Sequence, residues 1–249
     1  MDLIDLLGYL YVGCWSVSMY PPLWNNMKLH HTKAVSKDYV ILNSVGYCAL
    51  ILSMLIYALL WADPNSEVQE EAVQPTLTVF DFWYGIHSWF LNMMLATQVI
   101  WGRHLWGFKP EPTRRMKVVY VRLIYLTFMF AAAITINYLY QNWAYGRNNV
   151  NTLLYCNRLY LIKITMSVVK YIAQIKHNFE HKSMKGFPML SVMLDALGGI
   201  FSLVQLVLQL AKAPEFTMAV FIANFGKIGI GMVTLFFNFI YVSQWLLYR

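Results

Sequence analysis

The sequence predicts an all-α integral membrane protein of seven transmembrane helices, arranged as two parallel three-helix repeats that a linker helix joins. Three observations predict this class: an apolar composition, loops whose charge alternates along the chain, and a segment that recurs 152 residues later. Of the 249 residues, 59% are hydrophobic and 12% are charged, whereas a soluble domain carries roughly 25% charged residues. So few charges cannot cover a water-facing surface, which argues against a soluble enzyme.

Seven apolar stretches are long enough to cross a bilayer, because a spanning helix needs about 20 residues at about 1.5 Å per residue. They cover residues 6–25, 39–61, 80–101, 118–140, 153–175, 189–210 and 228–247. Short loops separate them, so we expect one compact membrane domain in contact with the lipid bilayer.

Basic residues gather in the loops that follow the first, third and fifth stretches. They include Lys28, Lys33, Lys37, Arg103, Lys109, Arg114, Arg115, Lys117, Lys176, Lys182 and Lys185. The loop after the second stretch instead holds Asp63, Glu67, Glu70 and Glu71. The positive-inside rule then places the basic loops and Arg249 in the cytosol and the N-terminus in the lumen or outside the cell. The net charge of +7 is explained by this topology, so we expect no nucleic-acid partner.

Cysteine and histidine patterns predict neither disulfides nor metal. Cys14, Cys48 and Cys156 are odd in number and lie inside apolar runs, unlike a disulfide framework or a CxxC site. The segment from His177 to His181 matches the H-x-x-E-H pattern of some zinc proteases. It lies in a basic loop with no extramembrane domain beside it, so no metal is expected. Asp2 and Asp5 occupy the place of a positive signal-peptide n-region, which argues against a cleavable signal.

Shifting the chain by 152 residues without gaps reveals an internal repeat. The shift pairs Asn26 with Asn178, Lys33 with Lys185, Val40 with Val192, Leu42 with Leu194, Asn43 with Asp195, and Gly46 with Gly198. Both copies enter a basic loop from the same side, so an axis along the membrane normal should relate them, as in some transporters. We expect a first repeat in 1–105, a linker helix with its loops in 106–150, and a second repeat in 151–249.

Two charged residues are expected deep in the membrane. Asp195 lies about six residues into the sixth stretch and Lys170 about five before the end of the fifth, so both are roughly 7 to 9 Å deep. Intramembrane charges cost several kcal/mol unless paired or hydrated, and they usually mark a transport pathway. A substrate or proton site is therefore expected, with a structural ion pair as the alternative. The first repeat has Asn43 where the second has Asp195, which suits coupling to a single proton.

Further candidates lie in the first repeat. Asp81 begins the third stretch at its luminal end and His87 follows it, so both could exchange protons with an acidic lumen, or could simply be interfacial residues. Pro21 and Pro22 interrupt the first stretch and remove backbone donors. Such irregular backbone is tolerated beside a cavity, so these prolines are predicted to form a hinge.

Two segments of the chain, and a stretch between them, hold polar and aromatic residues in a particular order and spacing. The first runs from Trp15 through Ser18 to Pro21 and then includes Asn26, Ser36, Asp38, Leu42, Asn43 and Gly46. The second includes Lys170, Tyr171, Gln174, Asn178, Phe179, Lys182, Ser183, Gly186, Leu194, Asp195, Gly198 and Gly199. Between them lie Phe80, Asp81, Phe82 and His87. In this order and spacing the two segments resemble the PQ-loop transporters, and within that family the cystinosins, including fungal vacuolar members. The stretch between them resembles the one that holds a family proton-coupling aspartate.

The resemblance implies a PQ-loop fold and a carrier that moves L-cystine with protons from an acidic organelle (vacuole, lysosome or endosome) to the cytosol. It implies protonation at Asp195 and Asp81, with no cofactor besides the coupling proton. The residues implied near the substrate are Lys170, Asn178, Gln174, Asn43, Trp15, Ser18 and Tyr171.

The chain departs from the family pattern at four positions. Pro22 replaces the glutamine of the first motif and Ala173 the proline of the second, Asn238 replaces an acidic residue of animal members, and Ser191 replaces an asparagine. A PQ-loop carrier for another amino acid therefore stays open. A seven-helix receptor is a further alternative, although it needs no internal repeat, and the chain has neither a DRY-like triplet after the third stretch nor an NPxxY motif in the last.

Overall fold

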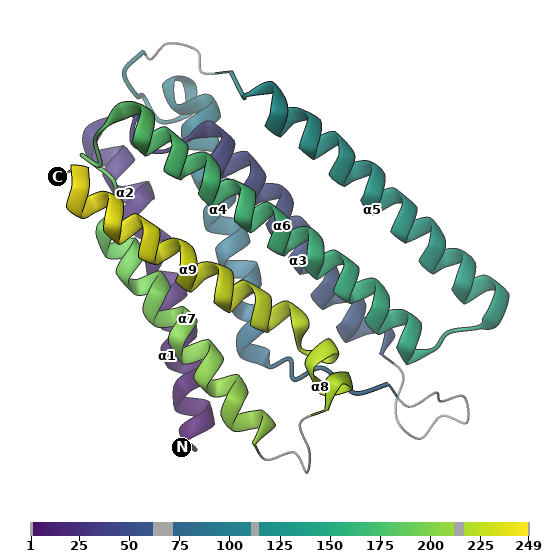
Figure 1. Ribbon diagram of the computed structural model, residues 1–249. Helices are drawn as coiled ribbons and strands as arrows, with labels where there is room; N and C mark the ends of the chain where they lie inside the picture. The colour runs from purple at the N-terminus through teal and green to yellow at the C-terminus, as the bar shows by residue number, and fades with distance from the viewer. Residues whose placement is uncertain (1, 62–71, 111–114, 212–216, 249) are drawn as a thin grey trace.

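The computed structural model describes residues 2–61, 72–110, 115–211 and 217–248 (Figure 1). These residues form nine helices: α1 (Leu3–Ser18), α2 (Tyr20–Leu29), α3 (Lys37–Leu60), α4 (Val79–Leu105), α5 (Val118–Tyr145), α6 (Asn149–His181), α7 (Met189–Leu210), α8 (Met218–Ala223) and α9 (Phe225–Tyr248). The predicted all-helical class is confirmed. Asp63, Glu67, Glu70, Glu71, Arg114 and Arg249, which entered the topology prediction, lie outside the described residues.

Five helical segments are long and apolar enough to cross a membrane: α1 with α2, then α3, α5, α7 and α9. The other two long helices, α4 and α6, have 27 and 33 residues but carry more polar side chains. Several of those side chains are buried in the bundle, among them Asn92 and Gln98 on α4 and Lys163 and Gln174 on α6. Polar residues that face the interior of a bundle lower a helix's hydropathy without exposing charge to lipid.

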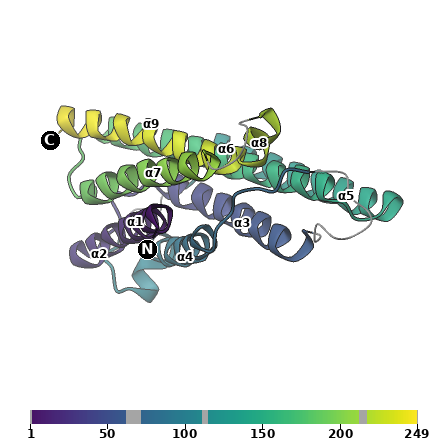
Figure 2. The same cartoon turned by 90° about the horizontal axis from the view of Figure 1, so that it is seen from below.

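The long helices other than α5 form two groups with the same internal order. In the first group α4 packs against both α1 and α3, and in the second α9 packs against both α6 and α7. The groups meet where α1 lies beside α7 and α3 beside α6 (Figures 1 and 2). The 152-residue shift relates α1 to α6 and α3 to α7, so the α1–α7 interface corresponds to the α6–α3 interface. The two groups are therefore related by a pseudo-twofold axis. Helix α5 packs mainly against α6, at the outer edge of the bundle.

Hydrogen bonds inside the two groups repeat as well. Asn26 donates through Nδ2 to Oε1 of Gln98 at 3.0 Å, and Asn178 donates in the same way to Gln244 at 3.0 Å. The two asparagines are 152 residues apart and the two glutamines 146 apart. The same amide pair therefore joins α2 to α4 and α6 to α9.

The interfaces between the groups also repeat. On one side Ser53 Oγ of α3 donates to the main-chain oxygen of Cys156 on α6 at 3.2 Å. On the other, Gln205 Nε2 of α7 donates to the main-chain oxygen of Ile4 on α1 at 3.1 Å. Both donors and both acceptors are related by 152 residues, so the structure itself carries the repeat.

The first apolar stretch is broken into α1 and α2 at Met19. Pro21 and Pro22 lie in the first turn of α2, where the amide hydrogen that proline lacks has no helical partner anyway. The prolines therefore start a new helix directly after the break, which fits the interruption that the sequence predicts.

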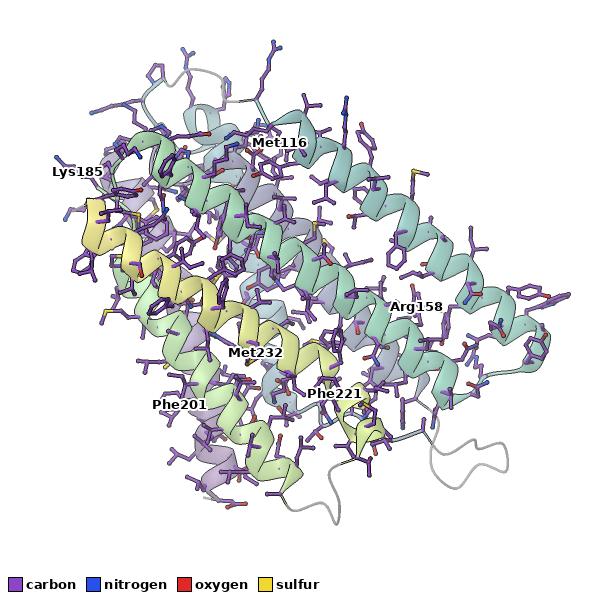
Figure 3. All side chains as sticks on the ribbon, viewed as in Figure 1. Met116, Arg158, Lys185, Phe201, Phe221 and Met232 are labelled. Carbon is purple, nitrogen blue, oxygen red and sulfur yellow. The ribbon has the colours of Figure 1, made fainter. Side chains whose placement is uncertain are left out.

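The basic loops share one end of the bundle. The loops after α2, α4 and α6 lie at the same end as the C-terminus, and the N-terminus lies at the opposite end (Figure 1). Met116 and Lys185, from two of these loops, are at that shared end in Figure 3, whereas Phe221 of α8 is at the other. The helices thus bring together the positive charges that the sequence places in separate loops.

Candidate functional site

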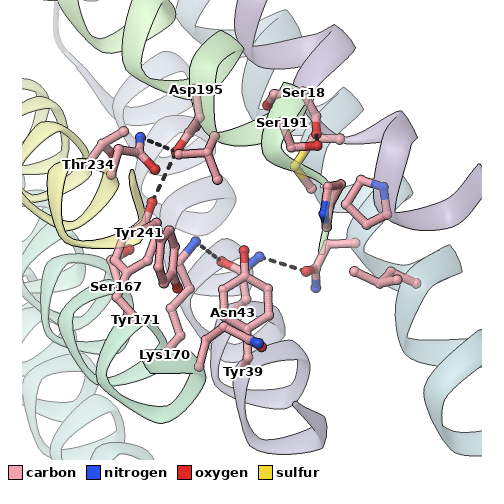
Figure 4. A pocket seen from close by; sticks show the side chains of 18 of the residues that line it. Ser18, Tyr39, Asn43, Ser167, Lys170, Tyr171, Ser191, Asp195, Thr234 and Tyr241 are labelled. Atoms are coloured by element: carbon pink, nitrogen blue, oxygen red, sulfur yellow. Dashed lines mark hydrogen bonds between the residues drawn. The ribbon is translucent and has the colours of Figure 1, made fainter. Parts of the chain in front are cut away.

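A pocket lies between the two helix groups (Figure 4). Of the residues expected near substrate or proton, it is lined by Ser18, Asn43, Lys170, Tyr171, Gln174 and Asp195. Helices α1, α3, α6 and α7 supply these side chains. Five tyrosines add aromatic faces and hydroxyl groups: Tyr39, Tyr47, Tyr84, Tyr171 and Tyr241. The pocket is therefore polar at charged points and apolar between them, which is typical of small-molecule sites.

Asp195 is held by neutral donors. Its Oδ2 accepts hydrogen bonds from Asn238 Nδ2 at 2.9 Å and from the Tyr171 hydroxyl at 3.2 Å. Lys170 Nζ instead donates to Oδ1 of Asn43 at 2.9 Å. Asp195 and Lys170 thus line one pocket, but in the described part of the chain no ion pair joins them. The structural ion pair considered from the sequence is not formed.

Asn43 occupies the position equivalent to Asp195 and makes the equivalent contact. Its Nδ2 donates to Oδ1 of Asn92 on α4 at 2.7 Å, while Asn238 on α9 donates to Asp195. Asn92 Nδ2 continues to Ser44 Oγ at 2.8 Å. At these equivalent positions the two halves of the pocket therefore share one geometry, with a carboxylate in the second half only.

Trp15 and Ser18 lie at the interface of α1 and α7. Trp15 Nε1 donates to the main-chain oxygen of Asp195 at 2.9 Å, and Ser191 Oγ donates to the main-chain oxygen of Ser18 at 2.6 Å. Ser18 lines the pocket. Trp15 lines a smaller neighbouring cavity together with Asp81 and Tyr84.

Gln174 and Asn178 lie between the pocket and the basic end. Gln174 accepts from the Ser36 amide at 2.9 Å and donates to Asn178 Oδ1 at 2.8 Å. Asn178 in turn donates to Gln244. Asn178 lines an outer cavity with Lys33 and Lys185 rather than the central pocket. These amides form a hydrogen-bonded layer across that end of the pocket.

Asp81 lies at the opposite end, where four helices meet. Its carboxylate is 3.1 Å from Lys227 Nζ on α9 and accepts from the Tyr11 hydroxyl at 2.9 Å. Lys227 also donates to Gln205 Oε1 at 3.1 Å. Asp81 caps α4 as well, since Thr78 and Asp81 form a reciprocal capping box. The cluster joins α1, α4, α7 and α9.

His87 does not join that cluster. Its Nε2 lies 3.0 Å from the Tyr20 hydroxyl, beside the break between α1 and α2. The two candidates predicted together at the start of α4 are therefore separated, and His87 is placed next to the predicted hinge.

The residues of the H-x-x-E-H segment contact other side chains. Glu180 forms an exposed ion pair with Lys117 at 2.8 Å, and the rings of His177 and His181 stand 4.2 Å apart. In the described ranges no group of three or more His, Cys, Asp or Glu residues is placed to hold a metal ion.

Sequence reasoning missed two lysines. Lys227 is the ion-pair partner of Asp81, and Lys163 lines the central pocket with its Nζ 3.5 Å from the centre of the Tyr47 ring. The available signal was its spacing, since Lys163 and Lys170 are two helical turns apart and share one face of α6.

Comparisons with known proteins agree with this architecture. Residues 3–63 and 155–214 each match the family described as PQ loop repeat. The two matches start 152 residues apart, which is the offset that pairs Asn26 with Asn178. Two PQ-loop copies in a helical membrane protein define the class.

Relatives with full-length similarity narrow the assignment. The chain is 42% identical over 249 residues to the cystine transporter of Saccharomyces cerevisiae, covering 100% of this chain and 95% of that protein. It is 26% identical to cystinosin of Bos taurus, covering 98% of this chain and 63% of the relative, and 26% identical to the cystinosin homolog of Caenorhabditis elegans, covering 97% and 56%. The chain thus spans little more than half of these animal relatives. The chain belongs to the PQ-loop family, in its cystinosin branch, and the resemblance stated from the sequence is confirmed.

Proposed function

We propose that this protein is a proton-coupled carrier that moves cystine from the lumen of an acidic organelle, a vacuole, lysosome or endosome, to the cytosol. The observation that carries the proposal is Asp195, a carboxylate in the pocket between the two helix groups, opposite its neutral counterpart Asn43. The name of the yeast relative, a cystine transporter similar along the whole chain, supports the substrate. A carrier of another amino acid is the alternative.

In this proposal the chain crosses the membrane seven times. The five apolar segments account for five of the crossings. Helices α4 and α6 make the other two, with their polar faces turned inward. The repeats are 1–105 and 151–249, with α5 in the linker 106–150. The basic end is cytosolic by the positive-inside rule, so the N-terminal end is luminal.

The proposed cycle uses Asp195 as the coupling site. Luminal protons neutralise its carboxylate, and cystine binds beside it with a carboxylate on Lys170 and an ammonium group on Asn43 Oδ1. Binding releases the hydrogen bond between Lys170 and Asn43, which now ties α6 to α3. The loaded carrier then opens toward the cytosol, where the higher pH removes the proton. Tyr171, Gln174 and Asn178 continue the polar path to that end.

Asp81 is the second proposed protonation site. Its ion pair with Lys227 holds α4 against α9 at the luminal end. Protonation of Asp81 removes the charge that Lys227 is paired with, so acid weakens this contact and favours opening to the lumen. We propose that His87, with Tyr20 beside the α1–α2 break, exchanges protons with the lumen, and that Pro21 and Pro22 form the hinge.

Asp195→Asn tests the coupling. The variant imitates the protonated group, so it should still exchange cystine between equal pools but should lose accumulation driven by a pH gradient. Purified protein in liposomes, with labelled cystine and with or without an imposed gradient, gives both measurements. Glu180→Gln removes a carboxylate from the surface and serves as the matched control, with no effect on accumulation. Unchanged pH-driven accumulation by Asp195→Asn would show that the carboxylate is structural.

A further inference from the structure

A cationic cavity lies at the basic end of the bundle, beyond the central pocket. Its volume is about 200 Å³. Among the residues that line it are Lys33, His177, Asn178, His181, Ser183 and Lys185, and no carboxylate is present among its described lining residues. Gln174 lines the central pocket and donates to Asn178 at 2.8 Å, so this amide pair stands between the two spaces. The proposed cycle has no use for the cations of the outer cavity.

Both repeats contribute to the charge of this cavity. Lys33 follows α2 and Lys185 follows α6, and the 152-residue shift relates the two lysines. His177 and His181 lie at the end of α6, with ring centres 4.2 Å apart. Like charges that share a cavity repel one another, and an anion between them removes that repulsion. The distribution of charge therefore favours a negatively charged ligand.

Hydrogen bonds between the repeats fix the loops that carry the two lysines. The His177 ring donates through Nε2 to the main-chain oxygen of Lys33 at 3.0 Å. Asn25 Nδ2 donates to the main-chain oxygen of Gly186, next to Lys185, at 3.3 Å. Asn25 and His177 are also 152 residues apart, so each repeat holds the loop of the other in a similar way. Because these bonds fix both loops, little backbone freedom is lost when a ligand binds.

The two histidines depart from the repeat. The shift pairs His177 with Asn25 and His181 with Leu29, so only the second repeat has imidazoles at these positions. The positive-inside rule accounts for lysine and arginine at this end of the bundle. It does not require two equivalent lysines to converge on one cavity, or histidines to line it with them. The cavity is therefore a more specific feature than the general basic character of these loops.

A phosphate monoester fits the groups that line the cavity. It carries a charge of about −1.5 to −2 at neutral pH and has three acceptor oxygens. The ammonium groups of Lys33 and Lys185 supply charged donors from two separate loops. The Ser183 oxygen accepts from the Lys185 amide at 3.1 Å, which leaves the hydroxyl hydrogen to donate. One water needs only ~15 Å³, so a space of about 200 Å³ admits a phosphate group together with water.

We propose that this cavity is a binding site for a phosphate monoester, carried either by the headgroup of a membrane lipid or by a soluble cytosolic molecule. Basic pockets between helices on the cytosolic side bind anionic headgroups, and the proposed topology places this end in the cytosol. Leu29 and Phe179 at the same end are 39% and 54% exposed, so apolar surface for lipid adjoins the cavity. A phosphate held by Lys33 and Lys185 joins the loops of the two repeats.

Lipids that differ in their headgroups test the site on the full chain in neutral detergent micelles. The probes are phosphatidylinositol monophosphate, which has a phosphate monoester, and phosphatidylserine at the same total negative charge, which has none. Thermal unfolding reports binding, because a ligand that binds only the folded state raises the unfolding temperature. We expect the phosphorylated lipid to bind at least ~10-fold more tightly, since one charge-assisted contact is worth about a factor of ten or more.

The soluble headgroup, glycerophosphoinositol phosphate, distinguishes the two sources of the phosphate. If it binds as tightly as the lipid, the site takes a soluble phosphate ester. If it binds much more weakly than the lipid, the acyl chains contribute and the site takes a lipid headgroup. Either result supports the cavity, provided that binding depends on its lysines.

Lys33→Gln combined with Lys185→Gln should weaken binding of phosphatidylinositol monophosphate at least ~10-fold. Lys28→Gln combined with Lys176→Gln is the matched control, because it removes the same charge from two exposed lysines outside the cavity. The control should keep the wild-type affinity. Equal weakening in the two double variants overturns the site, because it shows only a general attraction to the basic end.

The wild type alone also decides the question, should a variant fail to fold. Equal affinity for phosphatidylinositol monophosphate and phosphatidylserine at matched charge overturns the proposed site. None of these measurements involves cystine transport, so their outcome is independent of the test of proton coupling at Asp195.

Discussion

The indole nitrogen of Trp15 lies 2.9 Å from the main-chain oxygen of Asp195, and its ring covers Gly198 one turn further along α7. This contact joins the first repeat to the second beside the Asp195 carboxylate. It requires glycine, because an added Cβ at position 198 would lie 2.5 Å from Trp15 Cδ1.

Gly198→Ala should therefore push α1 away from α7. Overpacking of this kind costs about 1 to 3 kcal/mol, and thermal unfolding in detergent should shift downward accordingly. Gly13→Ala on α1 is the control, because nothing lies within 4 Å of its added Cβ. It should be neutral or stabilise by about 0.5 to 1 kcal/mol through helix propensity. Equal melting temperatures for the two variants would contradict the close approach at Gly198.

The buried ion pair between Asp81 and Lys227 should be a coupled unit. Their side chains are 8% and 7% exposed, so removing one partner should destabilise the protein by about 3 to 5 kcal/mol. The double variant Asp81→Asn with Lys227→Met should lose less stability than the two single variants added together, because it leaves no buried charge without a partner. A double-mutant cycle in unfolding measurements gives the coupling energy.

The exposed pair Lys117–Glu180 provides the control for that cycle. Its side chains are 40% and 44% exposed, and surface pairs couple by only about 0 to 1 kcal/mol. Additive effects at Asp81 and Lys227 would show that their contact is no stronger than this surface pair.

The hinge prediction concerns Pro21. Its ring prevents the backbone amide from bonding to the preceding turn, which keeps α1 and α2 separate at Met19. Pro21→Ala together with Pro22→Ala should allow one continuous helix and slow the exchange between inward-open and outward-open states. Cystine counterflow at saturating substrate measures this rate. A wild-type exchange rate in the double variant would show that the conformational change does not depend on these prolines.

The orientation prediction can be tested with single cysteines. After replacement of the three native cysteines with alanine, Arg147→Cys should react with an impermeant maleimide from the luminal side and Lys185→Cys from the cytosolic side. Both residues are exposed. Arg147 belongs to the loop between α5 and α6 and Lys185 to the loop between α6 and α7, and these loops lie at opposite ends of the bundle (Figure 1). Labelling of both from one side would refute the seven-span topology.

The sequence predicts the helices and the repeat because both leave periodic signals. Five of the seven stretches fall within one long helix, whereas 39–61 ends one residue past α3 and 6–25 is divided between α1 and α2. The shift that pairs Asn26 with Asn178 also relates their hydrogen bonds. Depth along the spans also placed Asp195 and Lys170 at a similar level, and both line the central pocket.

The bonding partners of the buried polar side chains could not be predicted from the sequence in the same way. Nothing in the sequence shows that Lys170 bonds to Asn43 rather than to Asp195, because all three residues line one pocket and side-chain direction decides the bond. The pairing of Asp81 with Lys227 was hidden by a change of offset, since the last helices of the two repeats are related by 146 residues and not 152. Short apolar α8 left no signal that could be separated from α9.

The two members of the Asp81–Lys227 pair occupy equivalent positions of the two repeats. If two identical three-helix units associated about the same axis, each such position would face its own copy, as aspartate against aspartate or lysine against lysine. Like charges at that distance in a buried cluster repel strongly. Opposite charges at these positions favour association of the two unlike halves over association of two identical halves. The two halves of this chain are therefore complementary at this contact, and α5 keeps both of them in one chain.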